Sequence, residues 1–319
     1  TVGNCTAVGA NALYANTTGT PNDAFGVAAL ANNTTGANNV AVGYTALTTN
    51  TTGQYNVGIG KNAIYYNTTG SYNTAIGSQA LQSNTTASYK TAVGYQSGYS
   101  NTTGAPNTSV GATSLYSNTT GAFNVAMGRD ALHSNTTASN NTAVGYQAGY
   151  SNTAAYQTFI GVQAGYSNTT GGGHTFVGYQ SGYTNTATNP NVALGTQSLY
   201  LNTSGGYNTA LGVSALLNNT TASNNTAVGY SALIFNSTGA NNTSLGSQAL
   251  YANTTGASNV AIGYQASYAQ TTAVQTTAVG TQALLANTTG QNDAFGYGAM
   301  AANTTGTYNT ALGNTALRF

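Results

Sequence analysis

Residues 225–239 read N-T-A-V-G-Y-S-A-L-I-F-N-S-T-G, and variants of this segment recur along the chain. Its central glycine follows an aliphatic or aromatic residue in all nineteen copies. The spacing is 17 residues, with two intervals of 16, and a fixed period of this kind indicates a repeat architecture. These residues are called the anchor glycines: Gly9, Gly26, Gly43, Gly60, Gly77, Gly94, Gly111, Gly128, Gly145, Gly161, Gly178, Gly195, Gly212, Gly229, Gly246, Gly263, Gly280, Gly296 and Gly313.

The repeat is too short for a pair of helices, and its many Gly, Asn and Thr residues oppose helix formation. Each copy contains two short apolar runs, A-V and A-L-Y, separated by N-T-T-G, which is typical of turns. We therefore predict an all-β parallel β-roll or β-solenoid of about 19 coils, each of 17 residues with two short strands. The anchor glycines should form one column, because they need a positive φ or lack room for a Cβ atom. The N-T-T-G segments should form one edge.

The repeat covers residues 1–319 without a linker or a change of composition. We therefore predict one domain, a single repeat array. Because the chain begins and ends inside a repeat, we interpret it as a segment of a longer fibre.

Each apolar run pairs a small residue with a large one. Adjacent residues of a strand point to opposite faces, so this pattern predicts two apolar faces. One face would close the coil, and the other would need a second apolar layer, most simply another copy of the chain. Phe159 and Phe176 replace Ala in the coils where Gly165 and Gly182 replace Leu, which suggests that those two columns share a face.

Only four residues are basic, three are acidic and none is Glu. The chain therefore has no basic surface for nucleic acid and few groups that transfer protons. Asp23 and Asp293 lie far apart in the array, and His133 and His174 have no metal-ligand spacing. We expect no catalytic residue, metal site or cofactor, and no membrane insertion by this segment. The single Cys5 excludes an intrachain disulfide and leaves interchain pairing open.

An Asn residue follows the second apolar run in nearly every coil. Most of these residues fit the N-glycosylation pattern N-x-[ST], but Asn152 and Asn185 do not. Two interpretations stand: a column of glycan acceptors, or an Asx-turn column whose amides form a hydrogen-bonded ladder. The fifteen matching residues are Asn16, Asn33, Asn50, Asn67, Asn84, Asn101, Asn118, Asn135, Asn168, Asn202, Asn219, Asn236, Asn253, Asn287 and Asn303.

A second column is aromatic, and its central part is called the Tyr ladder. Stacking between successive coils and a stripe that binds sugars or surfaces are both consistent with it. The ladder comprises Tyr99, Tyr116, Tyr150, Tyr166, Tyr183 and Tyr200, with His133 in the same register.

The N-T-A-V-G and N-V-A-I-G units at residues 141–148 and 259–266 resemble the head repeats of YadA-like trimeric autotransporter adhesins. The tandem N-T-A-V-G-Y-Q-A-L-Y-S-N-T-T-G pattern is also similar to repeat arrays of phage-type tail-fibre proteins. The resemblance implies a trimer of parallel β-rolls that forms a stiff stalk or head with an adhesive surface. It carries over no catalytic residue.

We therefore predict a structural, extracellular fibre subunit at a cell or virion surface, not an enzyme. Its partners would be copies of itself, in a homotrimer or helical filament, and surface glycans. The alternatives are a glycan-binding or ice-binding β-solenoid and an N-glycosylated sheath fibre. Against ice binding, Thr17 and Thr18 are adjacent and would point to opposite faces of a regular strand.

Overall fold

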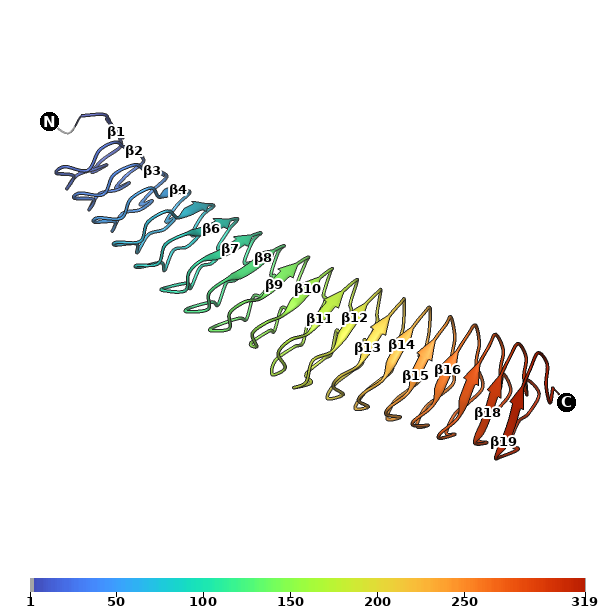
Figure 1. Cartoon of the computed structure of the whole chain (residues 1–319). Coiled ribbons are helices and arrows are strands. Elements are labelled where there is room, and N and C mark those ends of the chain that lie inside the picture. The colour runs from blue at the N-terminus through green and yellow to red at the C-terminus, as the bar shows by residue number, and fades with distance from the viewer. Residues whose placement is uncertain (1–2, 319) are drawn as a thin grey trace. The chain divides into compact units, whose positions relative to one another are not determined.

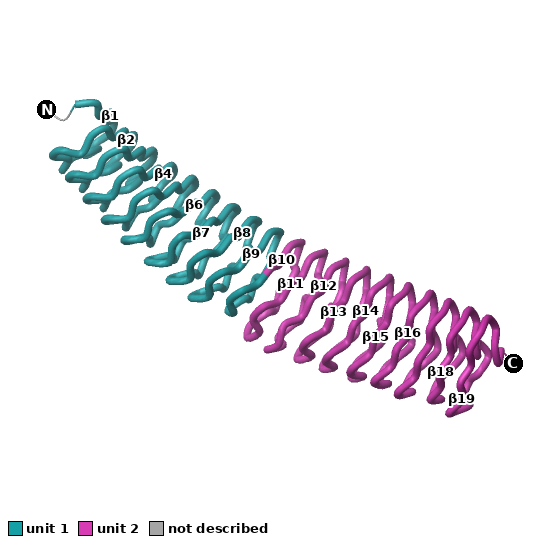
Figure 2. Tube along the Cα trace, viewed as in Figure 1, with its two compact units in different colours: residues 1–157 teal, residues 158–319 magenta. Residues whose placement is uncertain are grey.

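The computed structural model describes residues 3–318, so residues 1, 2 and 319 of the expected array lie outside the description. The protein is an all-β parallel solenoid of about 18 turns with one strand in each 17-residue repeat, and the described residues contain no helix. This confirms the predicted fold class. The coils fall into two compact units, residues 1–157 and residues 158–319 (Figure 2).

Unit 1 contains nine strands, which lie side by side in chain order (Figure 1). Their bounds are β1 (Cys5–Val8), β2 (Asn22–Phe25), β3 (Asn39–Val42), β4 (Val57–Ile59), β5 (Thr74–Ile76), β6 (Lys90–Val93), β7 (Asn107–Val110), β8 (Asn124–Met127) and β9 (Thr142–Val144).

Unit 2 contains ten strands arranged in the same way. Their bounds are β10 (Thr158–Ile160), β11 (Thr175–Val177), β12 (Val192–Leu194), β13 (Thr209–Leu211), β14 (Thr226–Val228), β15 (Thr243–Leu245), β16 (Val260–Ile262), β17 (Thr277–Val279), β18 (Asn292–Phe295) and β19 (Asn309–Leu312).

Equivalent residues of successive coils pair in parallel. Val57 of β4 pairs with Thr74 of β5, and Ile59 with Ile76, so the pairing offset equals the sequence period. Each coil thus satisfies backbone hydrogen bonds of the next, which a single 17-residue repeat could not do alone.

The strand separates small from large side chains. In β3, Ala41 is buried in the coil interior, whereas Val42 on the opposite face is 36% exposed. The large residues before the anchor glycines therefore lie on the outer face of the sheet, with the residues two positions earlier beside them.

The second predicted strand is wrong. The A-L segment forms turns, and Thr45 and Leu47 have φ angles of 54° and 51°. It still bonds to its neighbours, since the Leu47 N–H donates to the Ala63 carbonyl at 3.0 Å. The positive φ angles remove the alternation of a strand, and Ala46 and Leu47 are both fully buried. Of the two small–large pairs, only the one in the strand therefore leaves its large residue on the outside.

The volume exchange between Phe and Leu is present in the interior of unit 2. Phe159 and Phe176 are fully buried, and their rings stack with centroids 5.6 Å apart. A Cβ atom built on Gly165 would collide with the Phe159 ring, and one on Gly182 with the Phe176 ring. The rings fill the space that a Leu side chain occupies in other coils, so the two columns share the interior.

Candidate functional site

The anchor glycines form a column with an unusual backbone conformation. Their φ angles lie between 125° and 138°. A Cβ atom on Gly60 would lie 2.6 Å from both the carbonyl carbon and the oxygen of Gly77. Both expected reasons for glycine, a positive φ and close approach between coils, therefore apply at this column.

The fifteen Asn residues that match the glycosylation pattern point into the coil. Between Asn33 and Asn287 their side chains are at most 1% exposed. Asn50 Nδ2 donates to Asn33 Oδ1 of the preceding coil at 2.8 Å and to the Gly53 carbonyl at 3.0 Å. The same pair of bonds recurs in unit 2, where Asn219 Nδ2 donates to Asn202 Oδ1 and to the Ala222 carbonyl. This arrangement is the amide ladder of the second interpretation.

The ladder bears directly on the glycan interpretation. N-linked glycans are attached to the Nδ2 atom, which here uses both protons inside the coil. A glycan would break one of these bonds and would have to pass through the packed wall. The geometry therefore favours the ladder over a glycosylated sheath.

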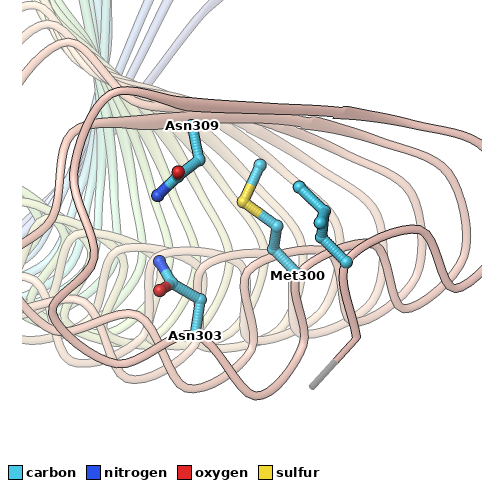
Figure 3. A pocket seen from close by; sticks show the side chains of 4 residues that line it. Met300, Asn303 and Asn309 are labelled. Carbon is cyan, nitrogen blue, oxygen red and sulfur yellow. The ribbon is translucent and has the colours of Figure 1, made fainter.

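A second amide column faces the first across the interior. In the last described coil, the side chains of Asn303 and Asn309 point toward one another beside Met300 (Figure 3). In the coils of β2 and β3, Asn22 Oδ1 accepts the Asn39 backbone N–H at 2.9 Å, so a side chain of one coil bonds the backbone of the next. The sequence analysis did not identify this ladder, although N-T-A-V-G places an Asn before most strands.

The Tyr ladder is a continuous stack within each unit. Tyr99, Tyr116, His133 and Tyr150 stack in unit 1 with centroids 5.0–5.2 Å apart. Tyr166, Tyr183 and Tyr200 stack in unit 2 at 5.0–5.2 Å. Each internal ring covers the faces of its neighbours, so these rings offer their edges rather than their faces. The arrangement supports the stacking interpretation over a sugar-binding stripe.

Lys90 occupies the second amide column and is buried, with 1% of its surface exposed. Its Nζ atom donates to Asn84 Oδ1 at 2.6 Å and to Asn101 Oδ1 at 2.5 Å. Burial lowers the pKa of the Lys90 amine from 10.5 to about 7. The amine thus stands inside the first amide ladder, between two oxygens that otherwise accept from neighbouring amides.

The two histidines occupy two different columns. His174 lies in the second amide column, where its Nδ1 accepts the Asn191 backbone N–H at 3.0 Å and its Nε2 lies 3.2 Å from the Ala187 carbonyl. Burial lowers the pKa of His174 to about 4, although the bond to Ala187 raises it. Burial also lowers the pKa of His133 in the Tyr ladder, and Asp130 opposes this shift. His174 is therefore neutral in the folded coil near pH 7.

The acidic, histidine and thiol side chains are the remaining candidates for a metal centre. Within residues 3–318, no three His, Cys, Asp or Glu side chains gather in a way that could hold a metal ion. Asp23 lies in unit 1 and Asp293 in unit 2. Cys5 is a free, partly buried thiol whose Sγ lies 3.5 Å from the Gly19 carbonyl.

Comparison with known proteins adds no assignment. No family model matches the chain, and no curated protein matches it. Across the described residues there is also no helix long and apolar enough to span a membrane.

Proposed function

We propose that the chain is a structural subunit of an extracellular fibre, at a cell or virion surface, and that it associates with copies of itself. Near-identical coils give a uniform surface, whereas catalysis needs one group of unlike residues in a pocket. Successive coils are joined by backbone hydrogen bonds of the sheet and of the A-L turns, and along most of the array by the two amide ladders. The adhesive role follows from the resemblance to adhesin heads and tail fibres.

The outer apolar column is the observation that carries this proposal. In unit 1, Val42, Ile59 and Ile76 are 36–40% exposed, and in unit 2 Leu194 and Leu245 are 50% and 45% exposed. Soluble monomers rarely expose continuous apolar patches larger than about 300–600 Å². A second copy has the same period, so its column can match this one coil by coil.

We expect the purified chain to form an oligomer whose mass is a multiple of 32.0 kDa. Changing Ile59→Lys and Ile76→Lys together should lower the mass in sedimentation-velocity measurements, because two charges would be buried in the contact. Thr52→Lys with Thr69→Lys is the matched control, since both threonines are exposed in the same coils. A wild-type monomer, or equal masses for both variants, would contradict the proposal.

Ice binding is a second candidate, and it would use the same outer face. The residue three positions before the anchor glycine is Thr in twelve coils. Thr209, Thr226 and Thr243 pair in register on neighbouring strands, beside the outer apolar column. This differs from the N-T-T-G threonines: Thr17 is not on a strand, and its hydroxyl donates to the Thr34 carbonyl at 2.8 Å.

A regular array of hydroxyl and methyl groups, repeated at the strand spacing of about 4.8 Å, is suited to ordering water. Thermal hysteresis of the full chain in dilute solution measures this activity. If a second copy covers the face, we expect none. Hysteresis that disappears in Thr226→Lys would establish the ice-binding function instead.

A further inference from the structure

One coil of unit 2 departs from the repeat in three interior columns at once. Ser267 stands in the interior Leu column, Gln270 in the first amide ladder and Thr276 in the second amide column. Each of these side chains is at most 1% exposed. The coil therefore keeps a buried interior but does not have the residues with which most coils fill it.

The three columns meet inside the coil. In the last described coil the equivalent residues are Met300, Asn303 and Asn309, and their side chains line one interior space (Figure 3). That coil lies two repeats further along unit 2. The three substituted residues therefore also surround one interior space.

The first amide ladder is interrupted at Gln270. In the usual arrangement, each amide nitrogen donates to the preceding ladder oxygen and to a carbonyl of its own coil. Gln270 Nε2 donates to the Ala273 carbonyl at 3.3 Å, and Asn253 Oδ1 of the preceding coil is left without a donor. Gln270 Oε1 and Ser267 Oγ are also buried and have no hydrogen-bond partner within residues 3–318. Two acceptors and one hydroxyl are thus unsatisfied in the same part of the coil.

Burial of a serine does not by itself leave a hydroxyl unsatisfied in this fold. Ser244 is also fully buried in unit 2, and its Oγ donates to the Ala249 carbonyl at 2.8 Å. Ser181 Oγ donates to the Ala193 carbonyl at 3.1 Å. Buried polar atoms are nearly always bonded in native proteins, so the three unsatisfied atoms around Gln270 indicate a further hydrogen-bonding group.

The substitutions also leave room for such a group. Compared with the usual Leu, Asn and Asn, the three side chains lack about two non-hydrogen atoms in total, and one water molecule occupies about 30 Å³ of liquid. In the coils of Gly165 and Gly182 a Phe ring replaces the missing Leu volume. No larger residue does so here, since the neighbouring small column keeps Ala261 and Ala278.

We propose that this coil binds one internal water molecule, which bridges the interruption of the first amide ladder. The water donates its two protons to Asn253 Oδ1 and Gln270 Oε1 and accepts the proton of the Ser267 hydroxyl. Buried waters typically make about three hydrogen bonds to polar groups that the chain leaves unsatisfied. A cation fits less well, because three neutral oxygens would replace its hydration shell inside a closed coil.

The water site does not depend on fibre formation. Its ligands lie inside a single chain, and all three are buried from solvent. The water is therefore enclosed when the coil folds, and it exchanges with solvent only when the coil opens locally.

A high-resolution crystal structure of the full chain tests the site directly. We expect one water within about 2.5–3.2 Å of Asn253 Oδ1, Gln270 Oε1 and Ser267 Oγ. The proposal is overturned if no water is found there, if the three atoms bond to other protein groups, or if a metal ion occupies the position.

Magnetic relaxation dispersion of water deuterons tests the same site in solution, because it counts water molecules that a protein holds for long times. Ser267→Leu with Gln270→Asn restores the usual residues, fills the space and lets the shorter amide donate to Asn253 Oδ1. This double variant should hold one long-lived water fewer than the wild type. Ser244→Ala is the control, since its hydroxyl is satisfied within the chain, and it should leave the count unchanged. Equal counts in the wild type and the double variant would refute the proposal.

Discussion

Gly60→Ala should destabilise its part of unit 1 by about 4 kcal/mol. Two effects add up: an L-residue at a φ of 131° is strained, and its Cβ atom would lie 2.6 Å from the backbone of Gly77. Relief requires the two coils to separate, which would also weaken the amide ladders between them. Hydrogen exchange of residues 43–77 should report faster opening of these coils.

Gly58→Ala is the matched control for this prediction. Gly58 lies two residues before Gly60 in β4, and its φ is not in the positive range. Fourteen of the nineteen coils already hold Ala in this column, and a Cβ atom on Gly58 would come no closer than 3.3 Å, to the Leu47 side chain. Exchange should change little. Equal acceleration in both variants would show that the anchor column has no special role.

The period alone was sufficient to predict the stacking, the parallel pairing and the anchor column. Period fixes which residues become neighbours, and the absence of any other residue at the anchor position indicates a backbone that only glycine adopts. Alternation within the strand also predicted that one of its two apolar faces points outward, but the sequence did not show which of them is the interior.

The second strand was mispredicted because the A-L segment has positive φ angles at Leu and other residue types that rarely adopt them. Leu47 has a φ of 51°, and no sequence rule expects a positive φ at Leu. A signal was nevertheless present: Gly98, Gly149, Gly165 and Gly182 occupy the same column, with φ angles of 59–61°. Glycines in a column of leucines indicate a left-handed position as well as missing side-chain volume.

The sequence also did not show whether the Asn side chains of the N-x-[ST] column point into the coil or toward solvent. N-x-[ST] describes a glycan acceptor only when the side chain is outside, and the pattern does not carry that information. The hollow lined by Tyr44, Thr45, Asn62, Tyr65, Tyr66 and Gln82 is harder still to predict, because it arises where a column changes from Tyr to Gln between coils. Regular columns can be predicted from a period, whereas pockets depend on departures from it.

Lys90→Asn is the second change with a large expected effect. Asn occupies this column in fourteen of the nineteen coils, so the variant restores the usual residue. Its side chain could accept the Asn107 backbone N–H, as Asn39 accepts that of Asn56 at 3.0 Å. Removal of the buried amine would also allow Asn101 to rejoin the first amide ladder. We expect the variant to be more stable near pH 7 and below.

The pH dependence gives this prediction its sign. The unfolded chain holds the Lys90 proton up to pH 10.5, whereas the folded chain releases it at about pH 7. Between these values the unfolded state binds more protons, so stability rises with pH. Below pH 7 both states are protonated and the full penalty remains, at most about 5 kcal/mol, because the oxygens of Asn84 and Asn101 partly solvate the ammonium.

Hydrogen exchange at residues 84–107, compared between wild type and Lys90→Asn at each pH from 6 to 9, measures the effect where it arises. A local measurement is needed because long repeat arrays do not unfold as one unit. The advantage of the variant should be largest at pH 6 and 7 and should shrink as the pH rises. Lys61→Asn, at an exposed position of the same unit, should show no such trend. A stability difference between wild type and Lys90→Asn that does not change with pH would contradict the lowered pKa of the buried Lys90 amine.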